Sequence, residues 1–101
     1  MIHELKIDKQ YFDAVIENKK TFEVRKKDRD FHVGDFLALN EMFEGAYTGR
    51  SVLTLVRYIL DEPEYCKDGF VTMGIKLCGV TYLAEYGMRM VLTREEAAED
   101  E

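Results

Sequence analysis

The sequence has one proline, no tryptophan and two cysteines in 101 residues. It also lacks any apolar run near the roughly 20 residues that a membrane-spanning helix needs, so we expect no membrane segment. The chain starts without the basic residues and apolar block of a signal peptide, which predicts a cytoplasmic protein. Its length is close to the commonest domain size and favours one compact domain.

The two cysteines, Cys66 and Cys78, are too far apart for a CxxC motif. In a cytoplasmic protein we expect both thiols to be reduced. Neither cysteine, nor His3 and His32, shows the spacing of a zinc site. We therefore predict no metal and no cofactor.

Acidic residues are concentrated at the end of the chain. The net charge is −6, but residues 94–101 hold five acids and one base, which leaves −2 for residues 1–93. The acidity is therefore largely a property of the tail and does not exclude an anionic partner. Thr93 and Glu96 match a capping box, yet the tail has almost no apolar face. We expect it to be partly disordered from residue 94.

Positive charge gathers in a different segment, residues 19–29. The segment contains six cations and two acids, a local net charge of +4. Such an island predicts an anionic partner. The six cations are Lys19, Lys20, Arg25, Lys26, Lys27 and Arg29.

Apolar and polar residues alternate at the start of this island and predict a strand over residues 21–26. Phe22 and Val24 would enter the core, and the opposite face would carry Glu23 and Arg25.

The rest of the chain reads as strands with one helix. Alternation or continuous β-branched character predicts strands, whereas Phe12, Val15 and Ile16 share one face of a helix. Gly74 stands where a bulge would help a sheet to curl. The result is an α+β fold, a small curled sheet or open barrel of about five to six strands. The predicted strands are 2–7, 21–26, 36–40, 52–60 and 70–77, and the helix is 9–17.

The octet Asn18-Lys19-Lys20-Thr21-Phe22-Glu23-Val24-Arg25 resembles the G-x-K-x-x-E-x-R signature of ASCH domains, which belong to the PUA-like β-barrel superfamily. Asn18 replaces the signature's glycine but also tolerates left-handed geometry. Other segments are similar to an uncharacterised bacterial and phage branch, domain-of-unknown-function family 3850. These segments are His3–Lys6, Lys26–Phe31, Val33–Asp35, Tyr47–Arg50, Tyr58–Leu60 and Tyr65–Lys67.

The resemblance covers about residues 1–80 and implies a single PUA-like domain there, an open β-barrel with one helix packed at its end. Residues 81–101 would form a C-terminal extension.

ASCH and PUA-like domains are expected to bind RNA or nucleotides in a cleft beside the signature strand. The resemblance implies the same here, with Lys20 and Arg25 contacting an anionic ligand and Glu23 orienting Arg25. The alternative for Glu23 and Arg25 is a solvated ion pair worth about 0–1 kcal/mol. Tyr47 is a further candidate for stacking on a base. The predicted binding set is Lys19, Lys20, Glu23, Arg25, Lys27, Arg29 and Arg50.

Two other functions remain open. Some small ASCH proteins are amidohydrolases of 4-N-acetylcytidine that use the signature lysine, a threonine three residues later and a distant glutamate. Lys20 matches that lysine, but Glu23 occupies the threonine's position; Glu62 or Glu64 would be the distant acid. The third reading is a protein-interaction module whose acidic tail shields the basic strand, so that removing residues 94–101 would strengthen RNA binding.

Overall fold

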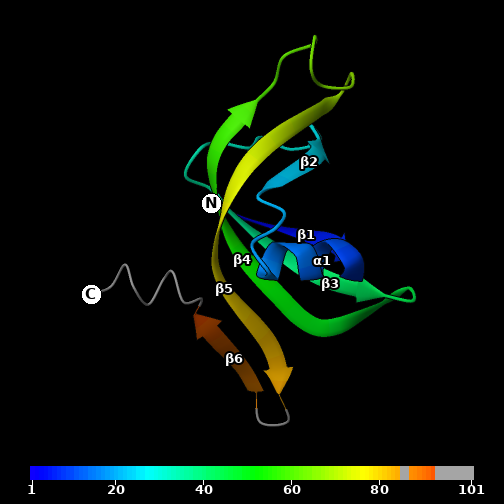
Figure 1. Cartoon of the computed structure of the whole chain (residues 1–101), viewed down its shortest axis with the longest axis vertical. Coiled ribbons are helices and arrows are strands. Elements are labelled where there is room, and N and C mark those ends of the chain that lie inside the picture. The colour runs from blue at the N-terminus through cyan, green and yellow to red at the C-terminus, as the bar shows by residue number, and fades with distance from the viewer. Residues whose placement is uncertain (85–86, 93–101) are drawn as a thin grey trace.

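The computed structural model describes residues 1–84 and 87–92. Its described part contains six strands and one helix (Figure 1). This α1 has eight residues, and no helix of the described chain is long and apolar enough to cross a membrane. The elements are β1 (Ile2–Asp8), α1 (Lys9–Ile16), β2 (Phe22–Lys26), β3 (Phe36–Phe43), β4 (Ala46–Leu60), β5 (Phe70–Ala84) and β6 (Gly87–Leu92).

All six strands belong to one mixed sheet in the order β1-β3-β4-β5-β2, and β6 also pairs with β5. The β1–β3 pair is parallel and the other pairs are antiparallel. β1 and β2 therefore lie at opposite ends of the strand order. Figure 1 shows β4 and β5 as long strands that bend across the molecule, with α1 inside their curve. The predicted α+β open barrel is confirmed.

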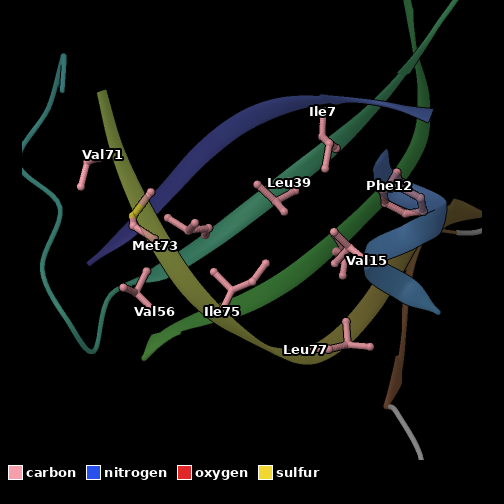
Figure 2. Close-up of a cluster of buried hydrophobic side chains, with 11 residues drawn as sticks. Ile7, Phe12, Val15, Leu39, Val56, Val71, Met73, Ile75 and Leu77 are labelled. Carbon is pink, nitrogen blue, oxygen red and sulfur yellow. The ribbon is translucent and has the colours of Figure 1, made fainter. Parts of the chain in front are cut away.

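The core fills the inside of this curved sheet. Alternate residues of the strands point inward, and α1 adds Phe12 and Val15 (Figure 2). These two lie on one face of the helix because three residues make almost one α-helical turn. The buried hydrophobic residues are Ile7, Phe12, Val15, Leu37, Leu39, Val52, Val56, Val71, Met73, Ile75 and Leu77.

Irregularities in strand pairing accompany the bending. The β4–β5 register shifts between Leu53 and Thr54 and again between Val56 and Tyr58. At the second shift Tyr58 pairs with Gly74, so the extra residue, Arg57, lies in β4 beside the predicted bulge position. Bulges increase local twist and let a sheet curl.

The basic segment begins at the corner between α1 and β2. Asn18 has φ 60°, the left-handed geometry expected of it. The amides of Lys19 and Lys20 both donate to the carbonyl of Ala14, which satisfies a free carbonyl in the last turn of the helix. Lys20 is thereby held at the start of β2.

The predicted orientation of β2 is wrong. Phe22 and Val24 are 47% and 50% exposed, whereas Glu23 is 2% exposed. The cause is register: Glu23 pairs with Met73, which points into the core, and directly paired residues share one face of a sheet. The strand was placed correctly, but its faces are exchanged.

The sheet continues beyond residue 80. β5 extends to Ala84, and β6 pairs with it from Gly79 to Ala84. The domain boundary at residue 80 stays a prediction. The expected disorder from residue 94 concerns residues outside the described ranges.

Candidate functional site

A cleft of about 760 Å³ lies where β1 approaches β2. Across this gap Arg25 Nη2 donates a 2.8 Å hydrogen bond to the carbonyl of Lys6. Four cations and one acid line the cleft, a balance of +3. The lining residues are Glu4, Leu5, Lys6, Arg25, Arg29, Asn40, Tyr47, Gly49, Arg50 and Ser51.

A second hollow of about 440 Å³ shares Lys6 and Arg25 with the first. We call the larger part the main cleft and the smaller part the side cleft. The side cleft also contains Lys20, Glu23 and the exposed ring of Tyr11. The two parts thus meet at the hydrogen bond that joins the two strands.

Glu23 organises the side cleft from its buried position. Its carboxylate accepts a hydrogen bond from Lys20 Nζ on one oxygen and from Arg25 Nε, at 2.8 Å, on the other. Lys20 Nζ also donates to the carbonyl of Phe22 at 2.6 Å. Burying a carboxylate is costly unless cations and hydrogen bonds compensate it, and here two cations do so. Glu23 thus contacts Arg25 from a buried position, which differs from a solvated surface pair, and its role in ligand binding stays a prediction.

Arg50 is held in the main cleft by a second buried carboxylate, Glu41. Arg50 Nε and Nη2 donate to the two Glu41 oxygens at 2.9 and 2.7 Å, and Nη2 is 3.3 Å from Asp13. These contacts lower the pKa of Glu41, mainly through the Arg50 hydrogen bond, and raise the pKa of Arg50. The guanidinium carbon also lies 4.7 Å from the centre of the Phe12 ring. Much of the charge of Arg50 is therefore neutralised by the fold.

Lys6 and Arg29 are the other two cations of the main cleft. Lys6 Nζ lies 5.8 Å from the centre of the Tyr47 ring, a cation–π arrangement at the rim. Arg29 is 3.7 Å from Asp28, whose side chain is itself well exposed. Neither cation pairs with a buried carboxylate in the described part of the chain, in contrast to Arg25 and Arg50.

Five of the seven predicted binding residues converge on the two parts of the cleft: Lys20, Glu23, Arg25, Arg29 and Arg50. Lys19 and Lys27 line neither part. Lys19 is exposed beside Glu17 at 3.1 Å, and Lys27 pairs with Asp61 at 3.0 Å on another surface. All of these cations are close together in the sequence, but Lys19 lies before β2 and Lys27 lies after it, and neither reaches the cleft.

Sequence reasoning missed Lys6 as part of the site. It lies on β1, 19 positions before Arg25, and nothing local marks it as a partner of the signature strand. Asn40 and Ser51 were also missed; Ser51 Oγ donates to Asn40 Oδ1 at 2.8 Å inside the main cleft. Tyr47, predicted as a stacking candidate, lines this cleft and is 60% exposed.

A third charged cluster lies away from the cleft and has a structural character. His3 Nε2 and Asp35 Oδ2 are 2.8 Å apart, and the amide of His32 donates to the same oxygen at 2.9 Å. These hydrogen bonds, that of His3 first, lower the pKa of Asp35 to about 2. The His3 ring also contacts Phe31 edge to face. The cluster joins β1 to the loop before β3.

Comparison with known proteins places this architecture in a family. The chain is 43% identical over 67 residues to the "Uncharacterized 12.9 kDa protein in GpA 3'region" of Escherichia phage P2. That match spans 66% of this chain and 62% of the phage protein's length. Residues 2–75 match the family described as "Domain of unknown function (DUF3850)". Because this match covers most of the chain, from β1 through β4 and into β5 as far as Ile75, the protein belongs to the DUF3850 family.

Proposed function

We propose that this protein is an RNA- or nucleotide-binding module that holds single-stranded RNA or a nucleotide in the main cleft. The observation that carries the proposal is the +3 lining of that cleft in a chain whose net charge is −6. Localised positive charge in a concave surface attracts phosphate groups. The proposal extends to a relationship with ASCH and PUA-like domains, supported by the signature in β2 and by the open barrel.

The four cations of the main cleft would have two different roles. Arg25 and Arg50 are bound to buried carboxylates and shape the walls. Lys6 and Arg29 present charge that the fold neutralises less, so they are the phosphate contacts. Tyr47 would stack on an unpaired base, as aromatic side chains do in single-strand binders.

The test is binding of a labelled single-stranded RNA decamer, followed by fluorescence anisotropy at several salt concentrations. Arg29→Gln should weaken binding and reduce the slope of log K against log salt by about 0.7, as expected for the loss of one phosphate contact in single strands. Lys67→Gln is the matched control, because it removes an exposed cation that lines neither part of the cleft. Equal losses in both variants, or no binding by the wild type, would refute the proposal.

A second function, amidohydrolysis of a 4-N-acylcytidine, is kept open by the direct contact between Lys20 and Glu23 in the side cleft. Two arrangements favour binding over hydrolysis. Both oxygens of Glu23 already accept hydrogen bonds from cations, and Glu62, one candidate for the distant acid, lines a different hollow with Lys27. Incubation of 4-N-acetylcytidine with excess protein, followed by chromatography, decides the matter. Release of cytidine that is lost in Lys20→Met would establish the enzyme.

A further inference from the structure

Two exposed aromatic residues flank a glycine on the outer face of the sheet. Phe22 of β2 and Tyr58 of β4 both pair directly with Gly74 of β5. Directly paired residues point to the same side of a sheet, and Tyr58 is 66% exposed. Figure 1 shows β5 passing between β4 and β2 at this end of the molecule. The three residues therefore form a row across three strands.

The geometry of this row leaves a gap above Gly74. Adjacent strands are about 4.8 Å apart, so the backbones of Phe22 and Tyr58 are roughly 10 Å apart. A planar ring in van der Waals contact on both sides needs about 7–8 Å. Gly74 contributes no side chain, and a Cβ built there would meet only Tyr58, at 3.6 Å. This backbone spacing matches one flat ring between the two aromatic residues, and we call the space over Gly74 the aromatic slot.

The outer faces of the three strands that form the row carry charge of one sign. β4 and β5 together contain no aspartate or glutamate. The single acid of β2 is Glu23, which points inward. Lys26 of β2, Lys76 of β5 and Arg57 at the β4 bulge are cations within four positions of the row along their strands.

Lys20 connects the aromatic slot to the cleft. Its Nζ lies 5.0 Å from the centre of the Phe22 ring while it bonds to Glu23. Phe22 also lines the side cleft, so the edge of β2 is shared by both surfaces. A nucleic-acid strand that leaves the side cleft over this edge of β2 would reach the slot without crossing a β-strand with outward acidic residues.

We propose that Phe22 and Tyr58 bind an unpaired nucleobase of single-stranded nucleic acid between their rings over Gly74, with the flanking phosphates facing the surrounding cations. Such a ligand has a flat aromatic ring that fits the slot and a chain of phosphates that complements the nearby cations. Apolar peptide side chains would fit the rings but would not require strands without acidic residues. This site is distinct from the main cleft.

The experiment uses a single-stranded RNA decamer that carries 2-aminopurine between uridines, with affinity measured by anisotropy and stacking by 2-aminopurine fluorescence. Tyr58→Ala should weaken binding roughly 5- to 150-fold, the range for loss of one stacked base. It should leave the salt dependence unchanged because no charge is removed. Tyr58→Phe should keep wild-type affinity. Tyr65→Ala, which removes another exposed tyrosine from the loop after β4, is the control.

Gly74→Val provides an independent variant that fills the slot. Gly74 does not have a left-handed φ, and its new Cβ would make an ordinary contact, so the variant should fold with an unchanged or higher melting temperature. It should nevertheless bind as weakly as Tyr58→Ala. If both variants bind and alter 2-aminopurine fluorescence like wild type, the slot proposal is overturned while the main cleft stands. Weaker binding by the two slot variants, with wild-type affinity for Arg29→Gln, would support the slot proposal and overturn the main-cleft proposal.

Discussion

Arg25 donates a 2.8 Å hydrogen bond from its guanidinium to the backbone carbonyl of Lys6, and this bond joins the two strands at the ends of the sheet order. The same guanidinium is fixed by Glu23. A buried carboxylate therefore positions a side chain that bridges the opening of the barrel. Glu23 and Arg25 therefore hold the two sides of the cleft together without any ligand.

Replacing Glu23 by glutamine should destabilise the protein. The substitution leaves Lys20 and Arg25 without their common counterion, but both are partly exposed and can be hydrated. We therefore expect a loss of about 1–3 kcal/mol in the free energy of unfolding, below the 3–5 kcal/mol for a fully buried pair. Urea denaturation measures it. Glu17→Gln breaks the exposed pair with Lys19 and should change stability by less than about 0.5 kcal/mol.

Arg50→Lys should reduce stability although the charge is kept. Lysine cannot reproduce the two parallel hydrogen bonds to Glu41, and the buried carboxylate would keep at most one of them. We expect a loss of about 1–3 kcal/mol. Thermal unfolding with Arg57→Lys as the control checks this, since Arg57 is exposed on the same strand. Equal melting temperatures for the two variants would contradict the structural role of Arg50.

Acid should unfold the protein partly through Asp35. Its pKa is lowered from 3.8 to about 2 in the folded protein, so folding favours the ionised form. The resulting stabilisation is fully present above about pH 4 and is lost as the pH falls from there toward 2. Unfolding free energies measured across that interval should fall less steeply for Asp35→Asn than for wild type. Asp30→Asn, at an exposed loop position, should keep the wild-type slope.

An outward residue of β2 and a core residue of β3 should respond differently to substitution. Val24→Thr replaces a half-exposed side chain on the outer face and should change stability by less than about 0.5 kcal/mol. Leu39→Ala, at a fully buried position, should cost about 2–5 kcal/mol by opening a cavity. Chemical denaturation of both variants tests the corrected orientation. A loss of more than about 2 kcal/mol in the free energy of unfolding for Val24→Thr would indicate that Val24 is buried in the core.

The local pattern of the chain was sufficient to place most elements. Asn18 ended the helix as expected, the run over residues 52–60 became part of a central strand, and Gly74 lies beside a bulge. Each of these depends on interactions between residues near in sequence or on a strong apolar pattern. The candidate residues Glu23 and Arg25, chosen by their spacing, line the side cleft, and their role in binding stays a prediction.

The orientation of β2 was not predictable in the same way. Alternation separates Phe22 and Val24 from Glu23 and Arg25 but does not say which pair is inside. Hydrophobicity favoured the wrong answer because two cations, one of them outside the strand, compensate the buried Glu23. Lys6 was missed for a related reason, since its role depends on how closely two edge strands approach.

The amino-acid sequence by itself determined the α+β class, the approximate positions of α1 and of the strands β1 to β5, the basic segment and the family. Only the tertiary structure decided which side of β2 faces the core, that β1 completes the cleft, and that Phe22 and Tyr58 stand on either side of Gly74. The physical reason is strand register. Pairing between β2 and β5 joins residues about fifty positions apart, and a shift of one residue would exchange the faces of the strand.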